Sequence, residues 1–209
     1  MNKYVTEFIG TFFLVFIIGL CVVQSVSMAP LAIGVGLMVV IYMGGHISGA
    51  HYNPAVTIGV MMRGSISSKE VVPYIVAQLA GAVAASLAVK GILGQTFAPA
   101  PGAGVSAGAA IAVEILFTFL LVLVILHVAT SKSTEGNDYY GLAIGLTVTA
   151  GAFAGGAISG GAFNPAVGVG PIVVDALMGN GTFGNLWLYL VGPIVGGALA
   201  AVVFKFQEK

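Results

Sequence analysis

Six long apolar stretches, separated by short polar or glycine-rich segments, dominate the pattern of hydrophobic and polar residues. Each is close to the length of about 20 residues that an α-helix needs to cross a hydrocarbon core of about 30 Å. The sequence therefore predicts an all-α membrane protein whose main partner is the lipid bilayer. The six predicted spans are residues 4–24, 29–46, 70–91, 108–130, 139–157 and 184–205.

The composition is typical of an integral membrane protein. Only 7% of the residues are charged and 58% are hydrophobic, and the mean hydropathy is +1.07; soluble domains have about 25% charged residues. The net charge is zero and the basic residues are scattered, so we expect no nucleic-acid partner. Cys21 is the single cysteine, which excludes an intramolecular disulfide and a thiolate metal cluster.

The basic residues indicate how the chain is oriented. Short loops rich in Lys and Arg stay in the cytoplasm, and with six spans the two termini share one side with the loops after spans two and four. That side has six basic residues, against Lys90 alone on the other. We therefore expect both termini in the cytoplasm. The first span has no basic n-region and no convincing cleavage site before or after it, so we expect it to be retained, and we expect the plasma membrane as compartment. The six basic residues are Lys3, Arg63, Lys69, Lys132, Lys205 and Lys209.

The chain contains an internal repeat. Residues 47–56 match residues 158–167 at seven of ten positions, with an offset of 111. Each half holds three predicted spans, an odd number, so the second half must enter the membrane from the opposite side. We expect one domain over residues 1–209, made of two inverted repeats at about 1–92 and 108–209. Further matches, with an offset of 107, pair Glu7, Thr11, Phe12, Leu14 and Val15 with Glu114, Thr118, Phe119, Leu121 and Val122.

An Asn-Pro-Ala motif occurs at matching positions in the two repeats. The apolar stretch after each motif, residues 56–62 and 167–176, is too short to span a bilayer. Each stretch predicts a re-entrant half-helix, which is tolerated at membrane depth only where it is buried in protein or lines water. Asn suits the N-cap of such a helix and Pro its first position. The motif residues are Asn53, Pro54, Ala55, Asn164, Pro165 and Ala166.

In this role each Asn side-chain oxygen accepts from the first helical turn, which leaves its NH₂ group to donate into a lumen. Because the repeats are inverted, the two helix N-termini meet near the midplane, and each carries about half a positive charge. Cations and hydrated protons are repelled there, whereas neutral molecules are not. Two fixed donors also orient a central water so that proton hopping is interrupted. The sequence thus predicts a passive pore for small neutral molecules.

The non-helical residues before each Asn contribute backbone carbonyls to this predicted pore. Such carbonyls replace part of a solute's hydration shell, and the glycines permit the unusual backbone angles that this arrangement needs. The residues are Gly49, Ala50, His51, Tyr52, Gly160, Gly161, Ala162 and Phe163.

These features together resemble the major intrinsic protein family, the aquaporins and aquaglyceroporins, over nearly the whole chain. The resemblance implies six tilted helices plus two half-helices, and homotetramers with one pore per subunit. It also implies a channel without a cofactor and not an enzyme, and we find no nucleophile paired with a base. Besides the two motifs, it rests on Gly10-Thr11-Phe12, Gly45-His46-Ile47-Ser48-Gly49, Val56-Thr57, Ala77-Gln78 and Gly192-Pro193-Ile194-Val195-Gly196-Gly197.

Two carboxylic acids and two histidines in apolar surroundings need an explanation. Glu7 and Glu114 lie inside predicted spans, where a carboxyl group is expensive. A proton relay is one interpretation, but the family implies a structural role in which each accepts hydrogen bonds from the loop N–H groups ahead of a half-helix. His46 and His51 are five residues apart with no third ligand near, so we expect no metal site.

The expected filter of the pore departs from the family pattern. Most members place an Arg directly after the second motif, where this chain has Val167. By their distance from the motifs, the other filter positions are Ile33, Ala152 and Gly161, and we call these four residues the filter ring. Without the guanidinium the ring is broad and apolar, so we expect ammonia, urea, hydrogen peroxide or glycerol to pass as well as water.

Two observations refine the expected solutes. The sequence does not decide how wide the ring is. Aquaglyceroporins commonly have an Asp shortly after the second motif, and its absence weakens a glycerol assignment. The run 164–171 resembles the plant vacuolar branch of the family instead. Phe153, or a residue of the 92–107 loop, could fill the space that the missing Arg leaves.

Two other classes of protein remain as alternatives. A secondary transporter also uses inverted repeats and broken helices, but it usually has a titratable group at its site, and both motifs here offer neutral Asn. A structural or adhesive membrane protein is the other alternative, and in it the filter ring would carry no solute.

Overall fold

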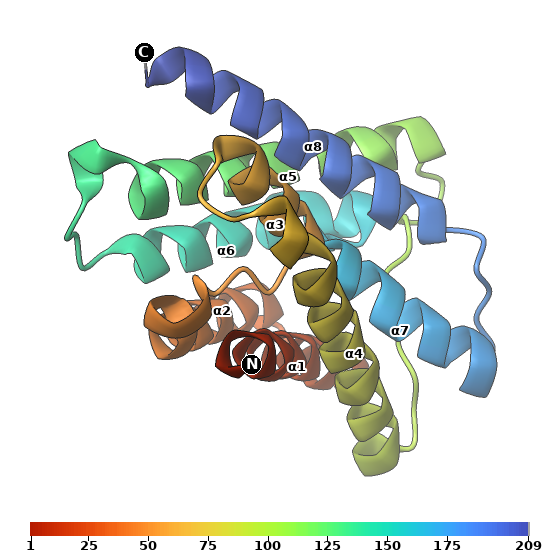
Figure 1. Cartoon of the computed structure of the whole chain (residues 1–209). Coiled ribbons are helices and arrows are strands. Elements are labelled where there is room, and N and C mark those ends of the chain that lie inside the picture. The colour runs from red at the N-terminus through yellow and green to blue at the C-terminus, as the bar shows by residue number, and fades with distance from the viewer. Residues whose placement is uncertain (209) are drawn as a thin grey trace.

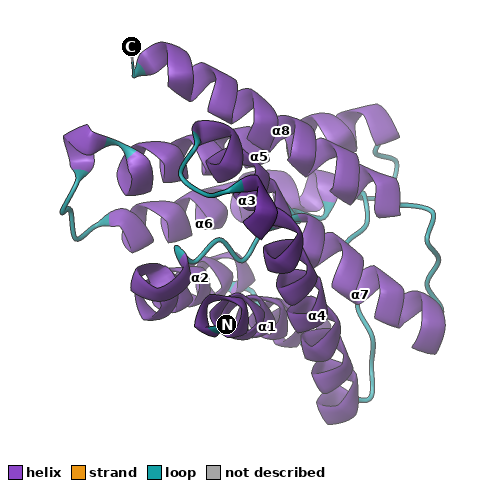
Figure 2. Ribbon diagram, in the orientation of Figure 1, coloured by secondary structure: helices purple, strands orange, loops and turns teal. Residues whose placement is uncertain are grey.

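The computed structural model describes residues 1–208, so Lys209, which entered the orientation argument, lies outside the described residues. Six of its helices are long and apolar enough to cross a membrane (Figure 1). No strand occurs within residues 1–208 (Figure 2), so the predicted all-α class is confirmed. The long helices are α1 (Asn2–Val23), α2 (Ala29–Ser48), α4 (Ser68–Leu93), α5 (Ala107–Thr130), α6 (Tyr140–Ser159) and α8 (Leu186–Gln207).

Two shorter helices, α3 (Pro54–Arg63) and α7 (Pro165–Met178), are the predicted half-helices. Each begins directly after the Asn of an Asn-Pro-Ala motif, with Pro at the first position, where no N–H is needed. Both extend slightly beyond the predicted apolar stretches, because the Pro and Ala of each motif are already helical and because α3 continues to Arg63 and α7 to Met178. In Figure 1, α3 and α7 leave the middle of the molecule toward different sides.

Glycine determines where α2 and α6 end. Gly49 and Gly160 have φ angles of 87° and 90°, in the left-handed region that favours glycine. Each N–H still bonds to the helix behind it, Gly49 to the Gly45 carbonyl at 3.0 Å and Gly160 to the Gly156 carbonyl at 2.9 Å. The chain therefore turns sharply out of both helices and enters the loops that precede α3 and α7.

The two halves of the chain repeat the same close helix contact. α1 packs against α4 at Gly81, where an added Cβ would overlap the Phe8 carbonyl oxygen. α5 packs against α8 at Gly196, where a Cβ would overlap the Ile115 carbonyl oxygen. Phe8 and Ile115 differ by the offset of 107 that relates the repeats in sequence. Both crossings therefore depend on a residue without a side chain.

We expect Gly81→Val to reduce the yield of monodisperse protein and its thermal stability in detergent. The new side chain must push α1 and α4 apart, and overpacking of this kind costs about 1–3 kcal/mol. Gly91→Val is the matched control on α4, because a Cβ there meets nothing within 4 Å. Size-exclusion profiles after heating would measure both variants. Equal stability of the two would contradict the close contact at Gly81.

One end of the bundle collects both termini, and we call it the terminus face. Lys3 near the N-terminus forms an ion pair of 2.6 Å with Glu70 at the start of α4. Ser131, after α5, donates to Glu208 at the end of the described chain, with 2.8 Å between the oxygens. Because consecutive long helices run in alternating directions, Lys90, near the end of α4, lies at the opposite end.

Candidate functional site

A cavity of about 980 Å³ runs through the bundle. Its lining includes Pro30 and Phe97 near one end and Ser131 and Asn137 at the terminus face. Asn53 and Asn164 lie between these ends, with Asn53 3% exposed and Asn164 4% exposed. The two motifs therefore meet in the middle of a passage, although they are 111 residues apart in the sequence.

The two asparagines hold the half-helices together as well as capping them. Oδ1 of Asn53 accepts from the Ala55 N–H, and Oδ1 of Asn164 from the Ala166 N–H, each at 2.9 Å. Nδ2 of Asn53 donates to the Phe163 carbonyl, and Nδ2 of Asn164 to the Tyr52 carbonyl, again at 2.9 Å. Each NH₂ group thus donates one hydrogen to a carbonyl of the other repeat, and its second hydrogen can donate into the cavity. From the sequence alone, we expect both hydrogens of each NH₂ group to donate into the lumen.

All eight residues predicted to contribute carbonyls line the cavity. Several of their N–H groups bond to side chains behind the loops, as in the first loop, where Ala50 N donates to Ser48 Oγ at 3.0 Å and the N–H groups of His51 and Tyr52 donate to Glu7. A backbone whose N–H groups point to one side presents its carbonyls to the other. The carbonyls of Tyr52 and Phe163 each accept one bond from an asparagine, and each keeps a second lone pair.

Glu7 and Glu114 organise the two loops from behind. Glu7 accepts from the N–H groups of His51 at 2.9 Å and Tyr52 at 2.7 Å. Glu114 accepts from the N–H groups of Ala162 at 3.1 Å and Phe163 at 2.7 Å. Both carboxylates are fully buried, and neither residue is among those that line the cavity. This position favours the structural role over a proton relay.

The carboxylates also hold an uncommon backbone conformation. Tyr52 and Phe163 both have a φ of 50°, which is sparsely populated for residues with a side chain. Successive N–H groups in such a conformation form a concave site for an anion, and the carboxylate of Glu7 or Glu114 occupies it. The buried carboxyl group and the strained loop therefore stabilise each other.

The first loop has polar contacts that the second lacks. Gln78 on α4 donates to Glu7 at 2.8 Å and to Thr57 Oγ1 at 3.0 Å, and His51 Nδ1 lies 3.1 Å from the same Thr57 oxygen. At the positions of His51 and Thr57, the second repeat has Ala162 and Gly168. The roles of Gln78 and Thr57 were missed, although both belong to the motifs that carried the family resemblance.

The four residues of the filter ring all line the cavity. Val167 lies in the first turn of α7, directly after the motif, and is 5% exposed. Phe153 does not fill the space of the missing Arg, because its side chain is 54% exposed and it does not line the cavity. The 92–107 loop does contribute to the lining, through residues 97–100. No side chain of the ring is charged or able to donate a hydrogen bond.

Comparison with known proteins gives matches over most of the chain. The model of the family described as "Major intrinsic protein" matches residues 1–204. "Glycerol uptake facilitator protein-like 6" of Lactiplantibacillus plantarum is 39% identical over 214 residues, covering 96% of this chain and 95% of that protein. "Probable aquaporin TIP1-2" of Oryza sativa subsp. japonica is 41% identical over 179 residues, covering 84% and 69%. The X-ray structure of the aquaglyceroporin from Plasmodium falciparum has a TM-score of 0.87 at 26% identity, covering 100% and 95%.

Proposed function

Because this chain belongs to the major intrinsic protein family and is therefore a membrane channel for water and small neutral solutes, we propose that it admits neutral solutes larger than water. The observation that carries the proposal is Val167, which stands in the lining where most members have an Arg. An apolar ring without a fixed guanidinium neither narrows the passage nor demands a particular hydrogen-bonding partner. Ammonia, urea, hydrogen peroxide and glycerol are the solutes we propose.

Two observations bear on how fast each of these solutes passes. A relative that is 39% identical is named for glycerol uptake, which favours including glycerol. Gly168-Val169-Gly170 lacks the Asp that is common in aquaglyceroporins, which argues for slower glycerol flux than urea flux. We therefore expect glycerol to be the slowest of the four solutes.

We propose that ions are excluded at the centre of the passage. The N-termini of α3 and α7 meet there, since Asn53 and Asn164 each bond to the residue before the other motif. Each helix end contributes about half a positive charge, and each Asn keeps one donor for a passing oxygen. Cations are repelled by this arrangement, and a neutral solute passes it.

The remaining features of the proposal concern orientation and assembly. We place both termini in the cytoplasm, supported by the basic side chains near the terminus face, and we place the chain in the plasma membrane. The matching contacts of Glu7 and Glu114 support two inverted repeats, at about 1–92 and 108–209. By resemblance to the family, we propose a homotetramer with one pore in each subunit.

Stopped-flow permeability to water, ammonia, urea, hydrogen peroxide and glycerol, measured on the same proteoliposomes, tests the proposed function. We expect each flux to exceed that of protein-free vesicles, and the activation energy of water flow to be close to that of free diffusion. A high activation energy would indicate a carrier, and a complete lack of flux a structural protein. Water flux without any of the four solutes would show that the filter is narrow.

A further inference from the structure

One turn forms part of the mouth of the cavity at the terminus face. This turn, residues 131–137, connects α5 to α6 and includes the short 3-10 helix η1 (Lys132–Thr134). Ser131, Thr134 and Asn137 are among its residues that line the cavity. The position of the turn therefore sets the shape of this opening.

The turn is fastened to the end of α5 by its own side chains. Nδ2 of Asn137 donates to the Val128 carbonyl at 2.7 Å and to the Thr134 carbonyl at 2.6 Å. Thr134 Oγ1 donates to the His127 carbonyl at 2.5 Å. These bonds give the turn a compact shape and fasten it to α5, and the carbonyl of Asp138, directly after the turn, accepts from Tyr42 Oη of α2 at 2.9 Å.

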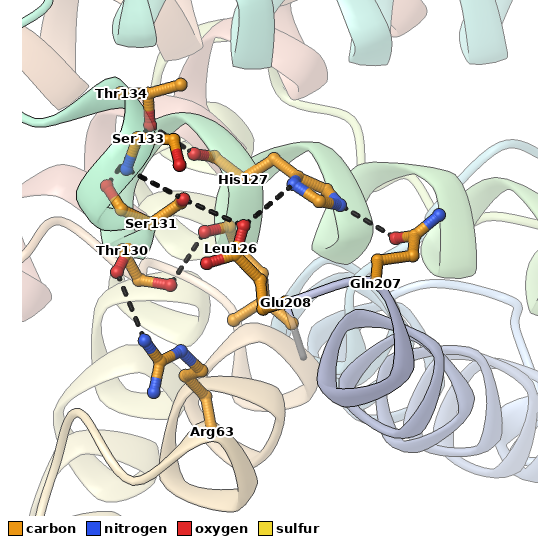
Figure 3. Close-up of polar contacts among 9 residues, drawn as sticks. All are labelled: Arg63, Leu126, His127, Thr130, Ser131, Ser133, Thr134, Gln207 and Glu208. Carbon is orange, nitrogen blue, oxygen red and sulfur yellow. Dashed lines mark hydrogen bonds and ion pairs between the residues drawn. The ribbon is translucent and has the colours of Figure 1, made fainter.

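The end of α8 and Glu208, which caps it, supply a further contact to the first residue of the turn (Figure 3). Ser131 Oγ donates to Glu208 Oε1 at 2.8 Å, and His127 Nε2 lies 2.8 Å from Gln207 Oε1. His127 Nδ1 is 4.0 Å from the same Glu208 oxygen. Both nitrogens of the imidazole thus face side-chain oxygens of α8 or of the residue that caps it.

A packed aromatic ring lies behind these polar contacts. Phe204 of α8 is 1% exposed, and the His127 ring meets it edge to face, with 4.9 Å between the centroids. The guanidinium of Arg63, at the end of α3, lies 5.0 Å from the same ring, and its Nη2 donates to the Thr130 carbonyl at 3.4 Å. The ends of a half-helix and two long helices therefore meet beside the turn.

We propose that Glu208 is a positioning residue for the pore: through Ser131, the first residue of the turn 131–137, it ties the turn to the end of α8 at the rim of the mouth, while His127 of α5 lies beside the same carboxylate. The turn lines the opening already, so a turn that keeps its bonds to α5 but loses its tie to α8 can shift at the rim and narrow the passage. The permeability of the channel thus depends on the last residues of α8, which lie outside the conducting path. This dependence rests on the cavity being the conducting pore.

Glu208→Ala removes both the acceptor for Ser131 and the partner of His127. We expect the water permeability per channel to fall, and by no more than about fivefold, because one lost hydrogen bond shifts a two-state equilibrium by about that factor and the open fraction falls by less than the shift. Glu208→Gln keeps an oxygen for Ser131, so we expect it to restore most of the flux. Lys205→Ala is the matched control, because this exposed side chain lies on the same turn of α8, and we expect it to conduct like the wild type.

Trypsin cleavage at Lys132 in the solubilised channel reports the position of the turn directly, since Lys132 is exposed in η1. We expect faster cleavage in Glu208→Ala than in Glu208→Gln or Lys205→Ala. Unchanged or higher permeability of Glu208→Ala would overturn the proposal, and so would unchanged cleavage. Wild-type channels without water flux would instead refute the proposed function, so the two failures are distinguishable.

Discussion

Replacing Val167 with arginine is expected to lower urea and glycerol permeability by at least about tenfold, which corresponds to about 1.4 kcal/mol in the barrier. The position lies in the first turn of α7, and its side chain faces the cavity together with those of Ile33 and Ala152. A guanidinium there occupies space in the ring and adds a fixed charge with five donors. Water is small enough to pass beside it, so water flux should fall much less.

Val167→Leu separates the effect of size from that of charge. It adds bulk to the filter ring without a hydrogen-bond donor, so we expect a smaller loss of urea and glycerol flux than with arginine. All three channels would be compared in the same vesicles, with flux normalised to protein. Unchanged solute permeability in Val167→Arg would place the constriction elsewhere, for which residues 97–100 are the nearest candidates in the lining.

The long helices and the half-helices were predictable because hydropathy and capping are local. The predicted span 108–130 differs from α5 (Ala107–Thr130) by one residue, and the Asn-Pro start of α3 follows from N-cap chemistry alone. The ends of α2 were harder to predict. Residues 47 and 48 are as helical as those before them, and the helix ends at Gly49, where the left-handed angle stops it.

The hydrogen bonds that Asn53 and Asn164 donate to the other repeat could not be predicted in the same way. The bond from Asn53 to the Phe163 carbonyl joins residues 110 apart, and no periodicity in the sequence encodes it. The inverted repeat indicates that the two motifs approach each other, but it gives no distance between them. Whether each NH₂ group donates a hydrogen bond to the other repeat depends on that distance, so the structure was needed to find these bonds.

His127 shows the same limit at the terminus face. In the sequence it is an isolated histidine near the end of an apolar span, and its partners Gln207 and Glu208 are about 80 residues away. A polar pair at the end of the last helix is also typical of a solvated terminus. The packing of α5 against α8 brings these groups together, and sequence reasoning had no measure of that packing.

The second large effect is expected from Glu114→Ala, which should abolish most water flux and most monodisperse protein. The carboxylate accepts from Ser159 Oγ at 2.7 Å and from the N–H groups of Ala162 and Phe163. Its loss leaves three buried donors without their acceptor, at about 1–3 kcal/mol each. Phe163 would also lose the contact that holds its φ of 50° and, with it, the carbonyl position that receives Asn53.

Glu114→Gln and Leu116→Ala complete this test. The glutamine keeps one acceptor oxygen but turns an NH₂ group toward buried donors, so we expect an intermediate loss. Leu116 lies two residues further along α5 with a side chain 64% exposed, so its truncation should leave yield and flux unchanged. Size-exclusion yield and flux per channel would be measured for each variant. A Glu114→Ala channel with wild-type stability and flux would mean that the loop before α7 keeps its shape through its own backbone, and that the buried carboxylate is dispensable.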